Sequence, residues 1–203
     1  MAYQLKDSYY RRAKREGYRS RAAYKLLELN ESFRLIQSGA RVLDLGAAPG
    51  GWLQVAARIV GPSGRVVGVD HQAIAPLGEE HVFLLQGDIL QEETQRQMRE
   101  LLGGQADCVL SDLSPRLSGI HDADVYRSVD LARTAFGIAC QLLKLGGGFL
   151  VKAFIGEETA ALFKSLKPFF ASVHRTRSEA TRKASSEIYL IGKGFRGSAK
   201  SQS

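Results

Sequence analysis

The stretch Asp44-Leu45-Gly46-Ala47-Ala48-Pro49-Gly50-Gly51 decides the fold, because it joins a predicted strand to a predicted helix through glycines. Residues 41–43 before it are typical of a buried strand, and residues 52–57 after it are typical of a helix. Glycines in such a turn let a ligand approach the backbone, because no Cβ stands in the way. An acid and glycines at a strand end suit a small ligand with an amino group and a ribose. An ordinary tight strand–helix turn is the alternative.

Strand-like and helix-like segments alternate along the rest of the chain. The predicted strands cover residues 41–45, 65–70, 82–86, 107–112, 148–154, 172–177 and 187–192. The predicted helices cover residues 20–29, 51–60, 91–102, 125–145 and 157–167. This alternation predicts an α/β, Rossmann-like fold with a seven-stranded, mostly parallel sheet and helices on both faces. No helix separates the last two strands, so we expect them to form an antiparallel hairpin at one edge.

The chain divides into three predicted segments, and only one of them is a folded domain. We expect a basic N-terminal arm over 1–19 that is mobile or partly helical, a single domain over 20–195, and a disordered tail over 196–203. With 203 residues and 44% hydrophobic content, one domain can bury a sizeable core. No apolar run is long enough to span a membrane, and no secretory signal or metal-ligand spacing is visible. We expect a cytoplasmic, metal-free protein, with a monomer as the default.

The net charge of +7 is distributed unevenly. Residues 6–25 hold eight Lys/Arg and two acids, and residues 164–200 hold nine and two, whereas residues 26–163 hold eleven and seventeen. Basic ends on an acidic body favour a polyanionic partner, although a solvated charged face is possible. The tyrosines among the N-terminal cations could stack on bases. We therefore expect nucleic-acid phosphates to contact Arg11, Arg12, Arg15, Arg19, Arg21, Arg175, Arg177, Arg182 and Lys183.

Two further acids close predicted strands next to the glycine turn. Asp70 ends the second strand and can accept hydrogen bonds from ribose hydroxyls, and Asp88 ends the third and can accept from an adenine amino group. Each alone could equally be a helix N-cap or a turn residue. With Asp44 at the first strand end, they favour an adenosine pocket. The sequence therefore predicts S-adenosylmethionine as the cofactor.

Charged residues also occupy positions where apolar ones are expected. Lys152 lies inside an apolar strand, and burial of an isolated ammonium costs several kcal/mol, so we expect a carboxylate partner or a role in chemistry. Asp112 ends the fourth strand and Glu187 opens the last one. Lys25 shares a helical face with Tyr18, Ala22 and Leu29, which points it towards the body, unless its ammonium reaches back into water.

These residues resemble those of the FtsJ/RrmJ family of S-adenosylmethionine-dependent RNA ribose 2′-O-methyltransferases. The likeness covers the segment from Ser20 to about Gly194 and includes the glycine turn through Trp52. It implies a catalytic set of Lys25, Asp112, Lys152 and Glu187, in which Lys152 accepts the proton and the two acids orient the two lysines. It further implies methylation of a uridine in large-subunit (23S) rRNA within the 50S particle.

The resemblance also implies which residues hold the cofactor. Gly46, Pro49, Gly51 and Trp52 would belong to its pocket, with Asp70 on the ribose, Asp88 on the adenine and Asp112 beside the methionine end. One departure concerns the substrate. Close bacterial relatives commonly read Asp-Met-Ala-Pro-Asn where this chain has Asp112-Leu-Ser-Pro-Arg116, and some family members act on tRNA. A tRNA substrate therefore stays open.

Particular residues argue against other functions. A cytosine-C5 methyltransferase needs a nucleophilic cysteine, and Cys108 and Cys140 fall in segments that read as buried. Enzymes that methylate adenine amino groups usually carry a polar-Pro-Pro-aromatic run after the fourth strand, which is absent here. A dehydrogenase would require the full dinucleotide turn, and Pro49 also removes an N–H that would cradle a pyrophosphate. A ribosome-assembly factor without catalysis is disfavoured by the complete set of four charged residues.

Overall fold

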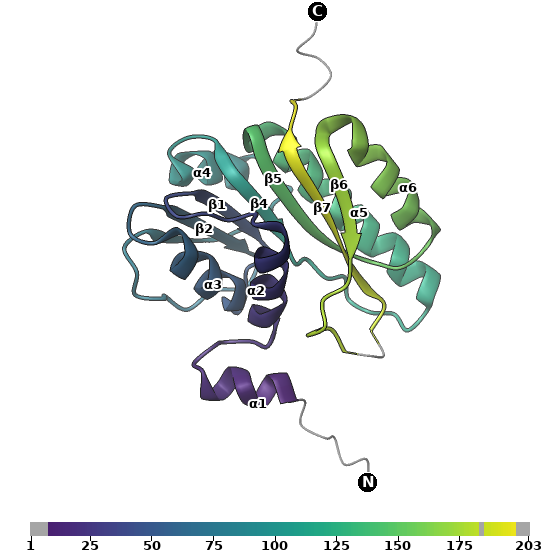
Figure 1. The fold of residues 1–203 in the computed structure, drawn as a ribbon, viewed down its shortest axis with the longest axis horizontal. Coiled ribbons are helices and arrows are strands. Elements are labelled where there is room, and N and C mark those ends of the chain that lie inside the picture. The colour runs from purple at the N-terminus through teal and green to yellow at the C-terminus, as the bar shows by residue number, and fades with distance from the viewer. Residues whose placement is uncertain (1–7, 183–184, 198–203) are drawn as a thin grey trace, which may run out of the picture.

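The computed structural model describes residues 8–182 and 185–197, and its centre is a seven-stranded sheet (Figure 1). The strand order is β3-β2-β1-β4-β5-β7-β6. The strands are β1 (Arg41–Leu45), β2 (Arg65–Asp70), β3 (Val82–Gln86), β4 (Ala106–Ser111), β5 (Leu143–Phe154), β6 (Phe170–Thr176) and β7 (Glu187–Phe195). The first five pair in parallel, while β7 runs antiparallel to both β5 and β6. The predicted fold class and its edge hairpin are confirmed, with β6 outermost.

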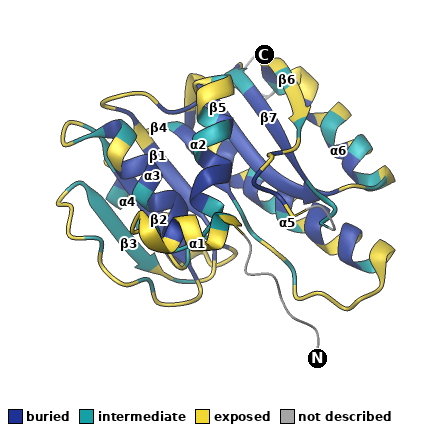
Figure 2. Cartoon of the chain, turned by 60° about the horizontal axis from the view of Figure 1, so that its bottom comes forward, coloured by how far each residue is buried: buried dark blue, intermediate teal, exposed yellow. Residues whose placement is uncertain are grey.

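Helices cover both faces of this sheet and enclose two apolar cores. The helices are α1 (Ser8–Arg15), α2 (Ala22–Phe33), α3 (Gly51–Val60), α4 (Glu92–Leu102), α5 (His121–Leu142) and α6 (Glu157–Leu166), with a 3-10 turn η1 (Lys167–Phe169). One core packs α2 and α3 on the face that holds Val42 and Leu150, and the other packs α4, α5 and α6 on the face that holds Leu43 and Phe149. Strand residues alternate between the faces, and Figure 2 shows the central strands buried between the helices.

Several element boundaries differ from the prediction, most of all the ends of α2 and β7 and the starts of α5 and β5. Helix α5 begins at His121 rather than 125, because buried Asp124 accepts hydrogen bonds from the backbone N–H groups of Ser118 and Gly119 and closes the turn before the helix. Its polar first turn has no apolar periodicity from which a helix could be predicted. Strand β5 begins at Leu143 rather than 148, directly after α5, so it includes residues 143–145, which were predicted to be helical.

The N-terminal segment is a docked helix over most of its described length. Ala13 of α1 is buried against Tyr24 of α2 and Ala180 of the loop before β7. This agrees with the expected partly helical arm. Residues 1–7 and the end of the predicted tail, 198–203, lie outside the described residues. Within the described ranges, no helix is both long and apolar enough to cross a membrane.

Gly68 of β2 is predicted to be a stability determinant, because it lets α3 pack closely on the sheet. A Cβ at this position would lie 2.6 and 2.7 Å from the two Cδ atoms of fully buried Leu53, and 3.2 Å from Cβ of Ala47. We expect Gly68→Ala to lower the free energy of unfolding by about 1–3 kcal/mol through overpacking, measured by urea denaturation.

Gly137 within α5 is the matched control. A Cβ there meets no atom within 4 Å, and the residue is helical, so Gly137→Ala is expected to raise the free energy of unfolding by about 0.5–1 kcal/mol. Equal unfolding midpoints for Gly68→Ala and the parent protein would contradict this account of the packing.

Candidate active site

The carboxyl edge of the sheet brings together the four charged residues that the sequence singles out. Ser111 of β4 lies opposite Val151 of β5, so Asp112, the next residue, lies beside Lys152. In the antiparallel pair, Lys152 lies opposite Tyr189 and Phe154 lies opposite Glu187. Lys25 reaches the same place from α2, and its side chain is buried, as the helical periodicity predicts.

The four residues form two ion pairs. Lys152 Nζ lies 3.2 Å from Oδ1 of Asp112 and donates a hydrogen bond to the Asp112 backbone carbonyl at 2.9 Å. Lys25 Nζ donates to Oε2 of Glu187. Both lysines are only 5% exposed, so each ammonium has a carboxylate partner in a region with little water. Pairing offsets the cost of burying these charges.

Tyr189 lies between these pairs and was not among the residues predicted for the site. Its side chain is fully buried, its hydroxyl has no hydrogen-bond partner among the described residues, and Lys25 Nζ lies 5.9 Å from its ring centroid. Burial, followed by the charges of Asp112 and Glu187, raises the pKa of Tyr189 well above its ordinary value. The sequence could have identified Tyr189 through its position two residues after Glu187. Side chains two residues apart in a strand lie on the same face.

A cavity of about 390 Å³ lies at the carboxyl edge of the sheet, next to the loop after Asp112. Three of the residues predicted to hold a cofactor line it: Gly46, Asp70 and Asp88. Asp44, Pro49, Gly51, Trp52 and Asp112 are not among its lining residues, although Leu113 and Ser114 after Asp112 are. The sequence did not suggest the wall that α5 contributes, which consists of Asp130, Leu131 and Thr134.

Backbone groups hold the two strand-end acids in place. Oδ2 of Asp70 accepts from the N–H of Ala48 at 3.0 Å and Oδ1 from that of Gln72 at 2.8 Å, while Oδ1 of Asp88 accepts from the N–H of Leu90 at 2.9 Å. The turn-forming role that the sequence allowed is therefore present. A carboxylate offers about four acceptor positions, so both acids retain capacity for a ligand.

Gly46 and Asp44 define the turn between β1 and α3. Gly46 has a φ of 79°, and a Cβ there would lie 2.9 Å from the Leu113 side chain, so glycine is required on both grounds. Asp44 is fully buried, and neither of its carboxyl oxygens has a hydrogen-bond partner among the described residues. Burial, followed by the charges of Asp112 and Asp70, raises its pKa well above the ordinary value.

Trp52 and Arg19 support the site from behind. Trp52 is buried, donates its indole N–H to the carbonyl of Ala22 at 2.9 Å, and so ties α3 to the start of α2. The Arg19 guanidinium donates to the backbone carbonyls of Pro49, Ala75 and Pro76. The contacts of Arg19 tie the glycine turn to the loop after β2.

A second cavity, of about 820 Å³, also contains residues of the carboxyl edge of the sheet. It is lined by Lys25 and Glu187, by one residue of α1, by residues of the loop before β7, and by the start of α5. Ser114, two residues after Asp112, lines this cavity and the smaller one. The loop after Asp112 therefore borders both cavities.

The residues predicted to contact RNA are not equally placed. Arg19, Arg21 and Arg182 line the larger cavity. Burial, followed by the charge of Arg182, lowers the pKa of Arg21, which indicates that these two guanidinium groups are neighbours. Arg12 pairs with Glu16, and Arg177 donates to the carbonyl of Ser185. Exposed side chains belong to Arg11, Arg15 and Arg175, and Lys183 lies outside the described residues.

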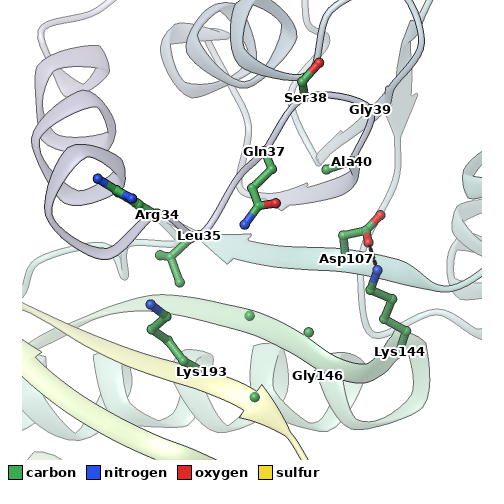
Figure 3. Close-up of a pocket in the computed structure, with 13 residues that line it drawn as sticks. Arg34, Leu35, Gln37, Ser38, Gly39, Ala40, Asp107, Lys144, Gly146 and Lys193 are labelled. Carbon is green, nitrogen blue, oxygen red and sulfur yellow. Dashed lines mark ion pairs between the residues drawn. The ribbon is translucent and has the colours of Figure 1, made fainter.

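A third pocket, of about 520 Å³, opens at the opposite edge of the sheet and contains none of the predicted site residues (Figure 3). Figure 3 shows Arg34 and Lys193 on one side of it and the Lys144–Asp107 ion pair on the other. In a parallel sheet, ligands bind beyond the carboxyl ends of the strands, so this pocket is not the expected place for catalysis. In the described part of the chain, no group of three or more His, Cys, Asp or Glu side chains could hold a metal ion.

Known proteins are similar to this chain in sequence and in fold. A large-subunit ribosomal RNA methyltransferase E from Methanothrix thermoacetophila is 54% identical over 95% of this chain and 74% of its own length. The corresponding protein from Methanothermobacter thermautotrophicus is 47% identical over 98% of this chain and 94% of its own length.

Solved structures agree. A protein from Plasmodium falciparum assigned as a ribosomal RNA methyltransferase matches 89% of this chain and all of its own with a TM-score of 0.79 at 29% identity. Fibrillarin from Aeropyrum pernix, with bound S-adenosylmethionine, matches 86% of this chain and 75% of its own at a TM-score of 0.55 and 20% identity, which shows a shared fold. The FtsJ-like methyltransferase family matches residues 18–195. This chain therefore belongs to the FtsJ-like methyltransferase family and is an RNA methyltransferase.

Proposed function

We propose that this protein transfers a methyl group from S-adenosylmethionine to a ribose 2′-hydroxyl of RNA. The observation that carries the proposal is that Ser114, two residues after Asp112 of the Lys152–Asp112 pair, lines two cavities. One cavity is lined by the strand-end acids Asp70 and Asp88, and the other is lined by three arginines. A methyl donor in the first cavity and an RNA acceptor in the second would therefore both lie next to the loop that begins with Asp112.

The smaller cavity suits S-adenosylmethionine, which would supply a methyl group already activated by its sulfonium charge. Asp70 and Asp88 would accept hydrogen bonds from the ribose and the adenine, and Gly46 would allow close approach of the backbone. Asp44 would place a carboxylate behind this cavity, where a cationic ligand would stabilise its charged form. Gly51, Pro49 and Trp52 would shape the turn, and Asp112 would lie towards the methionine end.

Lys152 would accept the proton that the 2′-hydroxyl loses as the new O–C bond forms. The hydroxyl is a weak nucleophile, so the enzyme needs to align it and to remove its proton. Free lysine is protonated at neutral pH and must lose a proton before it can accept one. Asp112 would orient Lys152, and Glu187 would orient Lys25.

Base methylation is the nearest competing reaction, and the cysteines argue against its C5 form. Burial raises the pKa of the Cys108 thiol well above its ordinary value and that of Cys140 to about 11. Neither residue lines either of the two cavities at the carboxyl edge. A thiolate nucleophile is therefore not available there at neutral pH.

The proposed substrate is a uridine of large-subunit (23S) rRNA within the 50S particle. The archaeal relatives named as large-subunit rRNA methyltransferases support the rRNA part of this proposal. A tRNA substrate is the second candidate, because Arg116 occupies the loop after Asp112. A monomeric state and a cytoplasmic location complete the proposal.

Removal of the Lys152 ammonium tests the reaction. We expect Lys152→Ala to lower the rate of methyl transfer about 10²–10⁴-fold, which is the usual contribution of a general base. The affinity for S-adenosylmethionine, measured by calorimetry, should stay within about twofold of the parent value. Transfer of labelled methyl groups is measured on free rRNA, 50S particles and tRNA, and the substrate modified fastest identifies the acceptor.

Lys144→Ala is the matched control, because Lys144 also pairs with an acid but lies at the opposite edge of the sheet. It should methylate RNA at the parental rate. Near-parental transfer by Lys152→Ala would rule out Lys152 as the base. Loss of cofactor binding in Lys152→Ala would instead assign this residue to the cofactor pocket.

Asp44 is expected to couple cofactor binding to proton release. The pKa of Asp44 is higher in the folded state than in the unfolded state. The folded protein therefore loses stability as the pH rises from the ordinary carboxyl range through the folded-state pKa, because a buried charge then forms. Asp44→Asn cannot ionise, so its melting temperature should exceed that of the free parent protein by a margin that grows with pH between about 5 and 8. A bound cation would favour the ionised form, so the parent should release a proton on binding S-adenosylmethionine.

Calorimetry in buffers of different ionisation enthalpy measures that proton release. We expect the parent to show it and Asp44→Asn to bind S-adenosylmethionine more weakly without it. A constant melting-temperature difference across the pH range, together with equal proton release by both proteins, would contradict this role for Asp44.

A further inference from the structure

Tyr10 differs from the other three tyrosines of the N-terminal basic segment. Tyr9, Tyr18 and Tyr24 pack together, with ring centroids 5.6 Å apart for Tyr9–Tyr24 and 5.5 Å apart for Tyr18–Tyr24. Tyr10 is 52% exposed and lines the larger cavity at the carboxyl edge of the sheet. The three packed rings therefore serve the fold, whereas Tyr10 presents an aromatic face to a space that also contains Lys25 and Glu187.

Helix α1 is anchored, so Tyr10 has a defined place. Buried Ala13 packs against α2, and Glu16 accepts hydrogen bonds from Arg12 Nε at 2.8 Å and from the Tyr24 hydroxyl at 2.9 Å. The segment after α1 is tied to α3, because Gln54 accepts from the N–H of Arg19 and donates to the carbonyl of Gly17. In Figure 1, α1 and the loop before β7 lie at the same edge of the molecule.

The lining of the larger cavity contains three kinds of group. Lys25 and Glu187 provide an ion pair, Arg21 and Arg182 provide neighbouring guanidinium groups, and Tyr10, Leu117 and Phe154 provide apolar surface. A nucleotide offers a matching set: a ribose hydroxyl, a phosphate and the flat face of a base. Guanidinium groups suit phosphate, and aromatic rings stack on bases. The volume of about 820 Å³ lies within the usual range for ligand pockets.

We propose that Tyr10 stacks on the base of the nucleotide that enters this cavity, so that the enzyme accepts its target in an unpaired, unstacked form. The proposal rests on RNA ribose methylation as the proposed function and adds the way in which the acceptor is held. Stacking on an aromatic ring requires a base whose face is free, which is the condition of nucleotides in loops and bulges. It is also tolerant of base identity, since every base has a π-face.

Substitution of Tyr10 tests this contact. Tyr10→Ala is expected to raise the RNA KM about 5- to 150-fold, the range that loss of one stacked base produces, and to leave the affinity for S-adenosylmethionine unchanged. Tyr10→Phe keeps the ring and should retain the parental KM, whereas Tyr10→Leu should resemble Tyr10→Ala. Tyr126→Ala is the matched control, because Tyr126 is 59% exposed on α5 and does not line the cavity.

An RNA with an abasic ribose at the modified position sharpens the test, because it keeps the 2′-hydroxyl and lacks the base. The parent enzyme should show a raised KM for this RNA, and Tyr10→Ala should show no further increase. An equal KM for Tyr10→Ala and the parent on intact RNA would overturn the proposal, as would a further increase for Tyr10→Ala on abasic RNA. A lowered melting temperature with weaker cofactor binding would show a structural role instead.

An error in the proposed reaction and an error in the proposed stacking contact would give different results. If the parent enzyme places the methyl group on a base, the ribose reaction is wrong whatever the Tyr10 variants do. If the parent yields the ribose product and the Tyr10 variants behave as the Tyr126 control does, only the stacking contact is wrong.

Discussion

Two buried ammonium groups, those of Lys25 and Lys152, impose the constraint on which the site depends. Each must be neutralised where water is scarce, and each is paired with a carboxylate from a different part of the chain. Removing one partner of such a pair would leave an uncompensated buried charge, which costs about 3–5 kcal/mol. The pairing therefore fixes the relative positions of α2, β4, β5 and β7 at this edge.

The topology of the sheet makes this pairing possible. Parallel strands β4 and β5 end at the same edge, and antiparallel β7 begins there, so Asp112, Lys152 and Glu187 become neighbours although they are far apart in the sequence. Helix α2 packs against one face of the sheet and brings Lys25 to β7. The loop after Asp112 then separates two cavities that share Ser114. Under the proposed function, the methyl donor and the RNA acceptor would bind to separate surfaces with one short loop between them.

The sequence predicts most of the fold because its strong signals are local. Apolar runs, glycine turns and helix periodicity predict β1, β2, β3 and α3 with the bounds that the structure has. They also place Asp112 and Glu187 at strand ends and Lys152 inside a strand. They also predict that Lys25 faces inward, which its burial confirms. Asp70 and Asp88 line the cavity that the glycine turn suggested.

What the sequence could not predict depends on tertiary contacts. The wall formed by Asp130 and Thr134 has no local signature, because polar residues one turn apart on a helix usually face solvent. The different placements of Tyr10 and its three neighbouring tyrosines follow from how α1 docks, and the start of α5 depends on the hydrogen bonds of Asp124. These features require the packed structure.

The position of the methyl group in the product tests the central claim most directly. RNA modified by the parent enzyme with labelled S-adenosylmethionine is digested to nucleosides, which are identified by mass spectrometry. The Lys152–Asp112 pair, with the loop after Asp112 bordering both cavities, predicts that the label is on the ribose, as a 2′-O-methylnucleoside. Label on a nucleobase, with an unmodified ribose, would contradict the account.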